Sequence, residues 1–380
     1  MVWTEKRVVD QRLEFVQLAS CGDVSMTELC RRFGVSRKTG YKWLARFDGT
    51  AVPASLTDAS RRPVSSPRRS TVDLEEQVIK LRLYKPAWGG RKISHVLMRD
   101  GGLQVAPSTV TAILHRHGLI EPAASAAATA WHRFEHPHPN SLWQMDFKGH
   151  FATHAGRCHP LTILDDHSRY NIALRACVNE QHDTVQTALQ DVFRRYGLPE
   201  RINTDNGHPW GSSGGNYLTA LGAWLIRLGV RVSHSTPLHP QTNGKDERFH
   251  RTLKAELLAH RSFADSHDCQ LAFDSWRPTY NHYRPHEALA MQTPGQRYTP
   301  SLIPFPEVMP TIEYSSQDTV RRVCNKGRIS LNGCSVFISV ALRGLPVALR
   351  YRTDAQEGFD VYFCHQRIRK LTPDDLDKAK

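Results

Sequence analysis

The spacing of apolar residues changes twice along the chain. Up to about residue 120, apolar positions recur every three or four residues, which is typical of amphipathic helices. From residue 141, apolar runs of strand length alternate with helical stretches, and beyond residue 319 only short strand-like runs remain. We therefore predict N-terminal all-α modules, a central α/β domain with a mixed sheet, and a C-terminal β-domain. The predicted boundaries are 1–52 for a first helical domain, 53–72 for a basic linker, 73–122 for a second helical module, 123–138 for a linker, 139–298 for the α/β core, 299–318 for a linker and 319–372 for a small basic β-barrel-like domain.

A helix-turn-helix is predicted near the N-terminus, in the stretch SMTELCRRFGVSRKTGYKWLARF. Gly34 breaks the apolar period of the first helix, and Ser36 is a suitable N-cap for the second. In such a motif the second helix enters the major groove of DNA, and its early side chains contact bases or phosphates. The candidate contacts are Arg37, Lys38 and Lys42. Gly40 is unfavourable inside this helix, and an ordinary helical hairpin with a basic surface is the alternative.

The segment that follows is predicted to be a linker. SLTDASRRPVSSPRRS has no apolar period and is rich in Ser, Pro and Arg, so it is able to follow a phosphate backbone. Its candidate DNA contacts are Arg61, Arg62, Arg68 and Arg69. Residues 74–120 again have a helical pattern, broken at WGGRK and DGGLQ, and we predict a second DNA-binding module there. The low-complexity tract EPAASAAATAW marks its end.

Basic and acidic residues are distributed unevenly between the predicted terminal domains and the centre of the chain. The net charge is +13, and residues 1–120 carry 20 Lys and Arg against 11 Asp and Glu, while residues 319–370 carry 10 against 3. Basic ends around a slightly acidic centre are typical of terminal modules that bind nucleic acid, although an ordinary surface excess of basic residues gives the same counts.

The 8 cysteines show no C-x-x-C spacing, which predicts reduced thiols. No apolar run approaches the roughly 20 residues that span a bilayer, so we expect a soluble, intracellular protein.

Three acids of the central domain are candidate metal ligands. Strands are expected within LWQMDFKGHF, HPLTILDDHS, YNIALRACV, ERINTDNG and VRVSHS. Asp146 then lies in the first strand, Asp205 closes the fourth, and Glu247 lies in the first turn of a later helix. Each acid alone is weak evidence, because a strand Asp usually caps a turn and a helical Glu is usually solvated. If they converge, however, they form an all-oxygen site that suits Mg²⁺ or Mn²⁺ better than zinc.

The combination of motifs is more specific than any single acid. WQMDFKG, NTDNG and HPQTNGKDERFHRTLK, in this order, resemble the catalytic core of the DDE transposase and retroviral integrase superfamily, and are most similar to bacterial insertion-sequence transposases. DDHSRY and YNHYRPHEAL also resemble that family. The resemblance covers Trp131 to about Tyr298 strongly and the N-terminal modules more loosely. It implies an RNase H-like fold in which Asp146, Asp205 and Glu247 hold two Mg²⁺ or Mn²⁺ ions for phosphodiester chemistry.

Two adjacent acids, Asp246 and Glu247, compete for the third position. In the family motif the acid directly before Arg is the essential one, which selects Glu247. Neighbouring helical side chains also point about 100° apart, so the two carboxylates are directed to different surroundings. Around them, the candidate contacts to the DNA backbone are Lys245, Arg248, Arg251 and Lys254. A solvated basic helix surface is the alternative for these cations.

Several other residues of the central domain are of types that bind metals or carry protons. Asp165 and Asp166 are alternative ligands, but their side chains are expected to stabilise a turn at a strand end. Packing or surface roles are expected for His208, His234 and His239. The Gly-rich HPWGSSGGNY lengthens the interval between Asp205 and the third acid and is expected to lie beside the site. No structural zinc is expected, because the two-His, two-Cys spacing of retroviral integrases is missing.

The resemblance implies a transposase that binds the terminal inverted repeats of an insertion sequence and catalyses metal-dependent DNA strand cleavage and strand transfer. Its partners would be the repeats, the target DNA and further copies of the chain in a dimer or larger assembly, within the bacterial cytoplasm. One alternative is a DNA-binding regulator derived from a transposase, which occupies the repeats without cutting. Another is an RNase H-type nuclease acting on RNA·DNA hybrids, which leaves the two helical modules unexplained.

Overall fold

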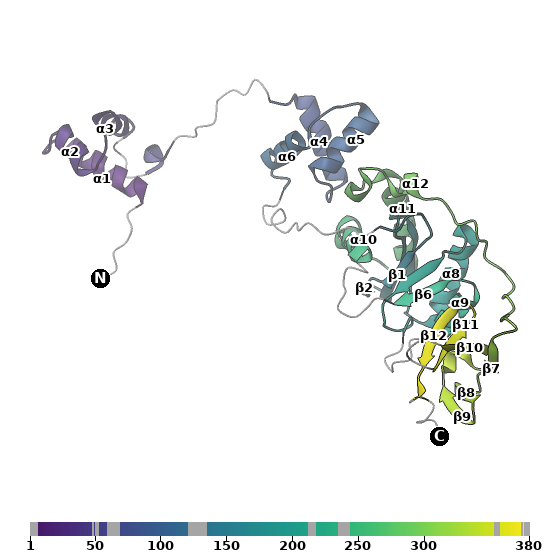
Figure 1. Ribbon diagram of the computed structural model, residues 1–380. Helices are drawn as coiled ribbons and strands as arrows, with labels where there is room; N and C mark the ends of the chain where they lie inside the picture. Colours follow the sequence, from purple (N-terminus) through teal and green to yellow (C-terminus); the bar gives the residue numbers. More distant parts are fainter. Residues whose placement is uncertain are drawn as a thin grey trace. The chain divides into compact units, whose positions relative to one another are not determined.

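The computed structural model describes residues 7–47, 49, 53–58, 69–120, 135–211, 218–234, 244–352, 358–373 and 375. Its contacts divide the chain into two compact units, residues 1–70 and residues 71–380 (Figure 1). The second helical module, the central sheet and the C-terminal strands therefore belong to one unit. Among the described helices, none has the length and apolar character needed to cross a membrane.

The first unit contains the predicted helix-turn-helix together with a preceding helix that the sequence analysis did not identify. Its helices are α1 (Val8–Cys21), α2 (Met26–Arg32) and α3 (Arg37–Leu44), followed by a 3-10 turn, η1 (Pro53–Leu56). Ser36 caps α3 as expected, because its hydroxyl accepts a hydrogen bond of 3.2 Å from the Thr39 N–H. Gly40 has a packing reason: a Cβ there would lie 2.8 Å from both Cys30 Sγ and the Phe15 ring. Glycine thus allows α3 to pack closely against the other two helices.

The second module begins the larger unit and has three helices, α4 (Val72–Tyr84), α5 (Gly90–Gly101) and α6 (Pro107–Arg116). The two predicted breaks fall between them. Gly102 ends α5 in the left-handed conformation at φ 66°, which glycine adopts at little cost. Trp88 and Ile93, both 0% exposed, lie in the apolar core of the module.

The central sheet contains β1 (Trp143–Phe147), β2 (Phe151–Thr153), β3 (Gly156–Asp165), β4 (Asn171–Cys177), β5 (Arg201–Thr204) and β6 (Arg231–His234). The strand order is β2-β3-β1-β5-β6, with β4 paired to β3. Strand β1 is antiparallel to β3 and parallel to β5. The first predicted strand is in fact two, because residues 148–150 turn the chain between β1 and β2.

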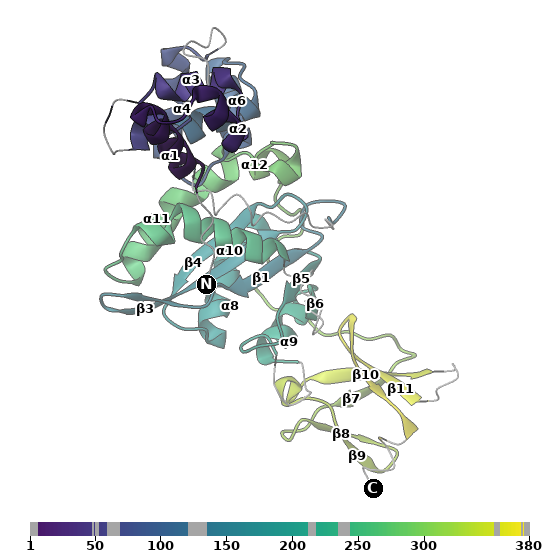
Figure 2. The same cartoon turned by 90° about the vertical axis from the view of Figure 1, so that its left-hand side faces the viewer.

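Helices cover both faces of this sheet. One face packs against α8 (His182–Tyr196) and α9 (Ala220–Arg227), and the other against α10 (Gly244–Glu256) and α11 (Ser266–Pro278) (Figure 2). Trp143 and Met145 of β1 belong to the core on the α8 and α9 side. Because successive strand residues point to opposite faces, Gln144 and Asp146 point to the side of α10.

The remaining short elements follow α11. They are the π-helical turn η4 (Thr279–Tyr283), the 3-10 turn η5 (Glu287–Leu289) and α12 (Pro294–Arg297). The C-terminal domain has a sheet of order β12-β11-β10-β7 and a separate β8-β9 pair. Its strands are β7 (Thr319–Arg322), β8 (Arg328–Leu331), β9 (Cys334–Phe337), β10 (Pro346–Arg352), β11 (Gly358–Phe363) and β12 (Gln366–Leu371). Strand β7 was not identified from the sequence.

The C-terminal domain shares an apolar core with the central α/β domain. Ala223 and Ile226 of α9 pack with Val347 and Val361 in one buried cluster. At the edge of the central sheet, the Gln366 side chain accepts from the Val232 N–H at 2.8 Å and donates to the Val232 carbonyl at 2.9 Å. This amide therefore pairs with the β6 edge as a neighbouring strand would. All eight cysteines are free thiols, as expected.

Candidate active site

Two of the three predicted acids lie at neighbouring strand ends. Asp146 is the fourth residue of β1, and Asp205 follows β5 directly. The two strands are parallel neighbours, with Trp143 opposite Ile202, so their carboxyl ends reach the same edge of the sheet. Glu247 lies in the first turn of α10, the helix on the face to which Asp146 points.

The other two acids contribute to the electrostatic environment of Asp146. Burial, then the charge of Asp205 and to a smaller extent the charges of Glu180 and Glu247, raise the pKa of Asp146 to about 7. Negative charge thus accumulates at this edge, and a bound cation would relieve it. The donor set is all oxygen, which fits Mg²⁺ or Mn²⁺. In the part of the chain that is described, no three His, Cys, Asp or Glu side chains lie close enough together to hold a metal ion, so this structure does not bring the three acids into one metal site.

The segment after β5 lies beside these acids. The Gly207 N–H donates a 3.0 Å hydrogen bond to Asp205 Oδ1, and the Trp210 ring stacks on Phe147 with centroids 5.8 Å apart. The first part of the Gly-rich loop therefore lies beside the end of β1, as expected, while residues 212–217 lie outside the described residues. His234 lies 3.0 Å from the Asp205 carbonyl and has a packing role. His239 also lies outside the described residues.

Asp246 is buried on the face of α10 that packs against the sheet. It is 1% exposed and belongs to the buried stripe of α10 with Phe249 and Leu253. Burial, followed by the charges of Asp146 and Asp166, raises its pKa well above the usual range. Its Oδ1 has no hydrogen-bond partner among the described residues. The spacing of residues 246, 249 and 253 on one helical face was the signal that sequence reasoning missed.

The helix separates the two adjacent acids as expected. Glu247 is exposed, whereas Asp246 faces the sheet. The burial of Asp246 does not make it the metal ligand, because a carboxylate that binds a catalytic metal must be reachable by the substrate. The assignment of the third ligand to Glu247 therefore stays a prediction.

The candidate DNA contacts fall into three groups. Arg37, Lys38 and Lys42 are exposed at the beginning of α3, and Arg248, Arg251 and Lys254 are exposed on α10. Arg69 is also exposed, whereas Arg61, Arg62 and Arg68 lie outside the described residues. Lys245 differs from the other α10 cations, because its ammonium forms an ion pair with the buried carboxylate of Asp166. A DNA contact by Lys245 remains a prediction that competes with this pair.

A basic groove that sequence reasoning missed lies between the β1–β2 turn and the C-terminal half of α10. Its volume is about 560 Å³, and its cationic and titratable lining residues are Lys148, His150, His154, Lys254 and Arg261, with no acidic residue. Burial and the charge of Lys254 lower the pKa of Lys148. Lys148 follows Asp146 by two residues, so the groove begins next to the acids. The available sequence signal was the lysine in WQMDFKG.

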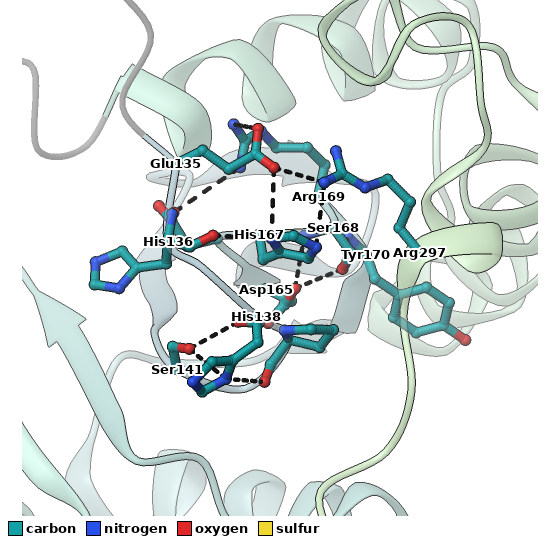
Figure 3. Close-up of polar contacts among 12 residues, drawn as sticks. Glu135, His136, His138, Ser141, Asp165, His167, Ser168, Arg169, Tyr170 and Arg297 are labelled. Carbon is teal, nitrogen blue, oxygen red and sulfur yellow. Dashed lines mark hydrogen bonds and ion pairs between the residues drawn. The ribbon is translucent and has the colours of Figure 1, made fainter.

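The DDHSRY segment forms the turn between β3 and β4. The Asp165 carboxylate accepts from the Asn140 N–H at 2.7 Å. The Ser168 N–H donates to the same carboxylate at 2.8 Å (Figure 3). The carboxylate also accepts from the Ser168 hydroxyl at 2.5 Å. Asp165 therefore stabilises a turn at the end of a strand, as expected. Asp166, 2% exposed, has separate partners.

Comparison with known protein families agrees with this arrangement. Residues 136–240 and residues 228–294 match two family models, both described as "Integrase core domain". Residues 11–63 match a helix-turn-helix domain, and residues 39–114 match a homeodomain-like domain.

Two curated relatives come from bacterial insertion elements. The insertion element IS407 uncharacterized 31.7 kDa protein of Burkholderia multivorans is 27% identical over 158 residues, which are 42% of this chain and 55% of the relative. The insertion element IS476 uncharacterized 39.2 kDa protein of Xanthomonas euvesicatoria is 27% identical over 158 residues, 42% of this chain and 44% of the relative. The chain thus matches about half the length of these relatives.

Among solved structures, the HTLV-2 integrase catalytic core domain in complex with magnesium is 19% identical, with a TM-score of 0.30, and the alignment covers 42% of this chain and 96% of that chain. The integrase core family is metal-dependent. The motifs, the mixed sheet with its acids and the family matches agree. Residues 136–294 therefore carry an integrase core domain, which supports membership in the DDE transposase and retroviral integrase superfamily, a family of DNA-cutting enzymes.

Proposed function

We propose that this protein is an insertion-sequence transposase that binds the terminal inverted repeats of its element and catalyses metal-dependent strand cleavage and strand transfer. The observation that carries the proposal is the accumulation of negative charge around Asp146, whose pKa is raised to about 7 by burial and by Asp205, with Glu247 adding to it. Carboxylates that repel one another at a strand edge are suited to divalent cations and poorly suited to a structural role.

The chain's own residues divide the work between metal binding and DNA positioning. Asp146 and Asp205 present carboxylates from the rigid ends of β1 and β5, and Glu247 presents the third from α10. These three carboxylates would hold divalent cations, which would supply activation of the attacking oxygen and stabilisation of the departing one. Because the side chains only hold cations and orient DNA, no covalent protein–DNA intermediate is required.

The basic groove supports a path for one DNA strand away from the acids. Arg251 and Lys254 follow Glu247 by one and two helical turns, so they extend from it along the same exposed face of α10. Lys148 lines the same groove as Lys254. Cations in such positions neutralise phosphates and orient the backbone without reading sequence. Sequence reading is assigned to the helix-turn-helix, where Arg37, Lys38 and Lys42 are exposed on α3.

The proposal is tested by strand cleavage and joining on a duplex that carries the element's end, with Mg²⁺. We expect wild type to form product, Glu247→Gln to bind the duplex without forming product, and Asp246→Asn to retain activity. Loss of activity in Asp246→Asn with retention in Glu247→Gln would reverse the assignment of the third ligand. If wild type binds the repeat yet forms no product with Mg²⁺ or Mn²⁺, a regulator that does not cut DNA replaces the enzyme. Preferential cleavage of an RNA·DNA hybrid would instead indicate an RNase H-type nuclease.

A further inference from the structure

Asp166 is a buried carboxylate that receives three donors from three parts of the chain. The His136 N–H donates to Oδ2 at 2.9 Å, the Gln144 side-chain amide donates to Oδ1 at 2.8 Å, and the Lys245 ammonium pairs with Oδ1. The Asp166 N–H also donates to the Leu142 carbonyl at 2.9 Å. With 2% exposure, this carboxylate depends on protein donors rather than water.

Two of these donors come from the segments that carry the predicted metal ligands. Gln144 precedes Asp146 by two residues in β1, and both side chains point to the same face of the sheet. Lys245 precedes Glu247 by two residues in the first turn of α10. One carboxylate therefore connects the strand of the first acid to the helix of the third.

The turn that carries Asp166 is held on its other side by a second network. Glu135 contacts Arg297 at 2.7 Å and His167 at 3.4 Å (Figure 3). Arg169 lies 4.0 Å from both Glu135 and Asp166. With Asp165 fixing the turn from within, Asp166 has little freedom to follow α10 if that helix moves.

We propose that Asp166 is a positioning residue that sets the distance between Asp146 and Glu247 by binding Gln144 and Lys245. In this role the Lys245 ammonium serves the protein interior rather than the DNA backbone. The inference rests on the proposed metal-dependent function of the three acids. Its physical basis is that groups which orient metal ligands affect metal affinity without touching the metal. A buried ion pair with further hydrogen bonds also specifies one geometry more narrowly than apolar packing does.

Lys245→Met distinguishes a positioning role from a purely electrostatic one, because the two predict opposite changes in Mn²⁺ affinity. Removing a cation near the acids makes the site more negative, so electrostatics alone predicts tighter binding of Mn²⁺. Loss of the Asp166 contact frees the first turn of α10, so positioning predicts weaker binding, by about tenfold. Calorimetric titration of the full chain with Mn²⁺, without DNA, gives the affinity. Lys245→Arg preserves the ion pair with Asp166 and is expected to retain most of the wild-type Mn²⁺ affinity.

A matched control breaks another ion pair at the opposite end of the same helix. Arg284 pairs with Glu256 at 2.7 Å, and the two side chains are 11% and 7% exposed. Arg284→Met is expected to lower the melting temperature while leaving Mn²⁺ affinity within about twofold of wild type, since groups more than about 7–10 Å apart act independently. Equal losses of Mn²⁺ affinity in Arg284→Met and Lys245→Met would mean general loosening of α10 and would overturn the inference, as would tighter binding by Lys245→Met.

Asp146→Asn and Glu247→Gln distinguish failure of this inference from failure of the proposed function. If neither changes the Mn²⁺ isotherm, the acids do not form the metal site and the proposed function fails with the inference. If both weaken Mn²⁺ binding but Lys245→Met does not, the metal site stands and the positioning role of Asp166 alone is rejected.

Discussion

At the residue scale, His250 connects the catalytic strand to α10 through neutral hydrogen bonds. Its Nε2 lies 2.8 Å from the Thr162 hydroxyl, which in turn donates to the Asp146 carbonyl at 2.9 Å. Burial, and then the charge of Lys148, lower the pKa of His250 to about 4. The imidazole is therefore neutral in the folded protein at physiological pH and donates from Nε2.

This histidine predicts an acid-sensitive stability. Its pKa is about 4 in the folded state, below the ordinary value of 6.5, so the unfolded chain binds more protons between those values. The contribution of His250 is complete above pH 6.5 and is lost as pH falls towards 4, with a slope of at most about 1.4 kcal/mol per pH unit. His250→Gln keeps a donor but does not titrate. Urea unfolding between pH 4.5 and 7.5 should show a shallower pH dependence for the variant; identical slopes would contradict the assignment.

Gly40 provides a second prediction at this scale. A methyl group at this position would approach Cys30 Sγ and the Phe15 ring to 2.8 Å, and both atoms lie in the core of the first unit. Overpacking of this kind costs about 1–3 kcal/mol, which exceeds the gain of about 1 kcal/mol in helix propensity. Gly40→Ala should therefore lower the free energy of unfolding and weaken repeat binding. Lys42→Ala is the control, because it should weaken repeat binding without changing stability.

At the element scale, the C-terminal end of α10 joins the second helical module to the catalytic domain. Glu256 accepts from Trp88 Nε1 at 3.0 Å, Trp276 Nε1 at 3.2 Å and Arg284 Nε at 2.7 Å. The Trp88 ring stacks on Tyr283 with centroids 5.8 Å apart. The YNHYRPHEAL segment thus supplies part of the surface on which this module packs.

Breaking this junction should release the module. Glu256→Ala leaves the largely buried Arg284 unpaired, and loss of one partner of a buried ion pair costs about 3–5 kcal/mol. Glu256→Gln keeps acceptors for the indole N–H groups and should cost less. Hydrogen exchange at Trp88 and Tyr283 should rise more in the alanine variant, with repeat binding by the helix-turn-helix retained. Unchanged exchange in both variants would show that Glu256 does not hold the junction.

At the scale of the whole molecule, basic surface is distributed over the helix-turn-helix, the groove beside the acids and the C-terminal domain. The C-terminal domain is continuous with the catalytic domain through the α9 cluster and the pairing of Gln366 with Val232. The groove and the C-terminal domain therefore belong to the same compact unit.

The groove predicts a measurable salt dependence of DNA binding. Each phosphate contact contributes about 0.9 to the slope of log affinity against log salt. Lys148→Gln and Lys254→Gln should each reduce that slope by about one and weaken binding to all sequences alike. Arg343 is exposed on the C-terminal domain. Arg343→Gln therefore tests whether the reduced salt slope is specific to the groove. Equal reductions at all three positions would show a general effect of net charge.

The sequence by itself determined the periods of the helices and strands and the turn at Asp165, and its motifs selected three acids as candidate metal ligands, because these depend on local spacing and on residue types. It did not show α1, which is only weakly amphipathic, or β7, which has four residues. Only the tertiary structure decided that Asp246 is buried, that Lys245 pairs with Asp166, and that Lys148 and Lys254 share a groove. Those outcomes depend on partners distant in sequence, since the cost of a buried charge is set by whichever groups the fold brings beside it.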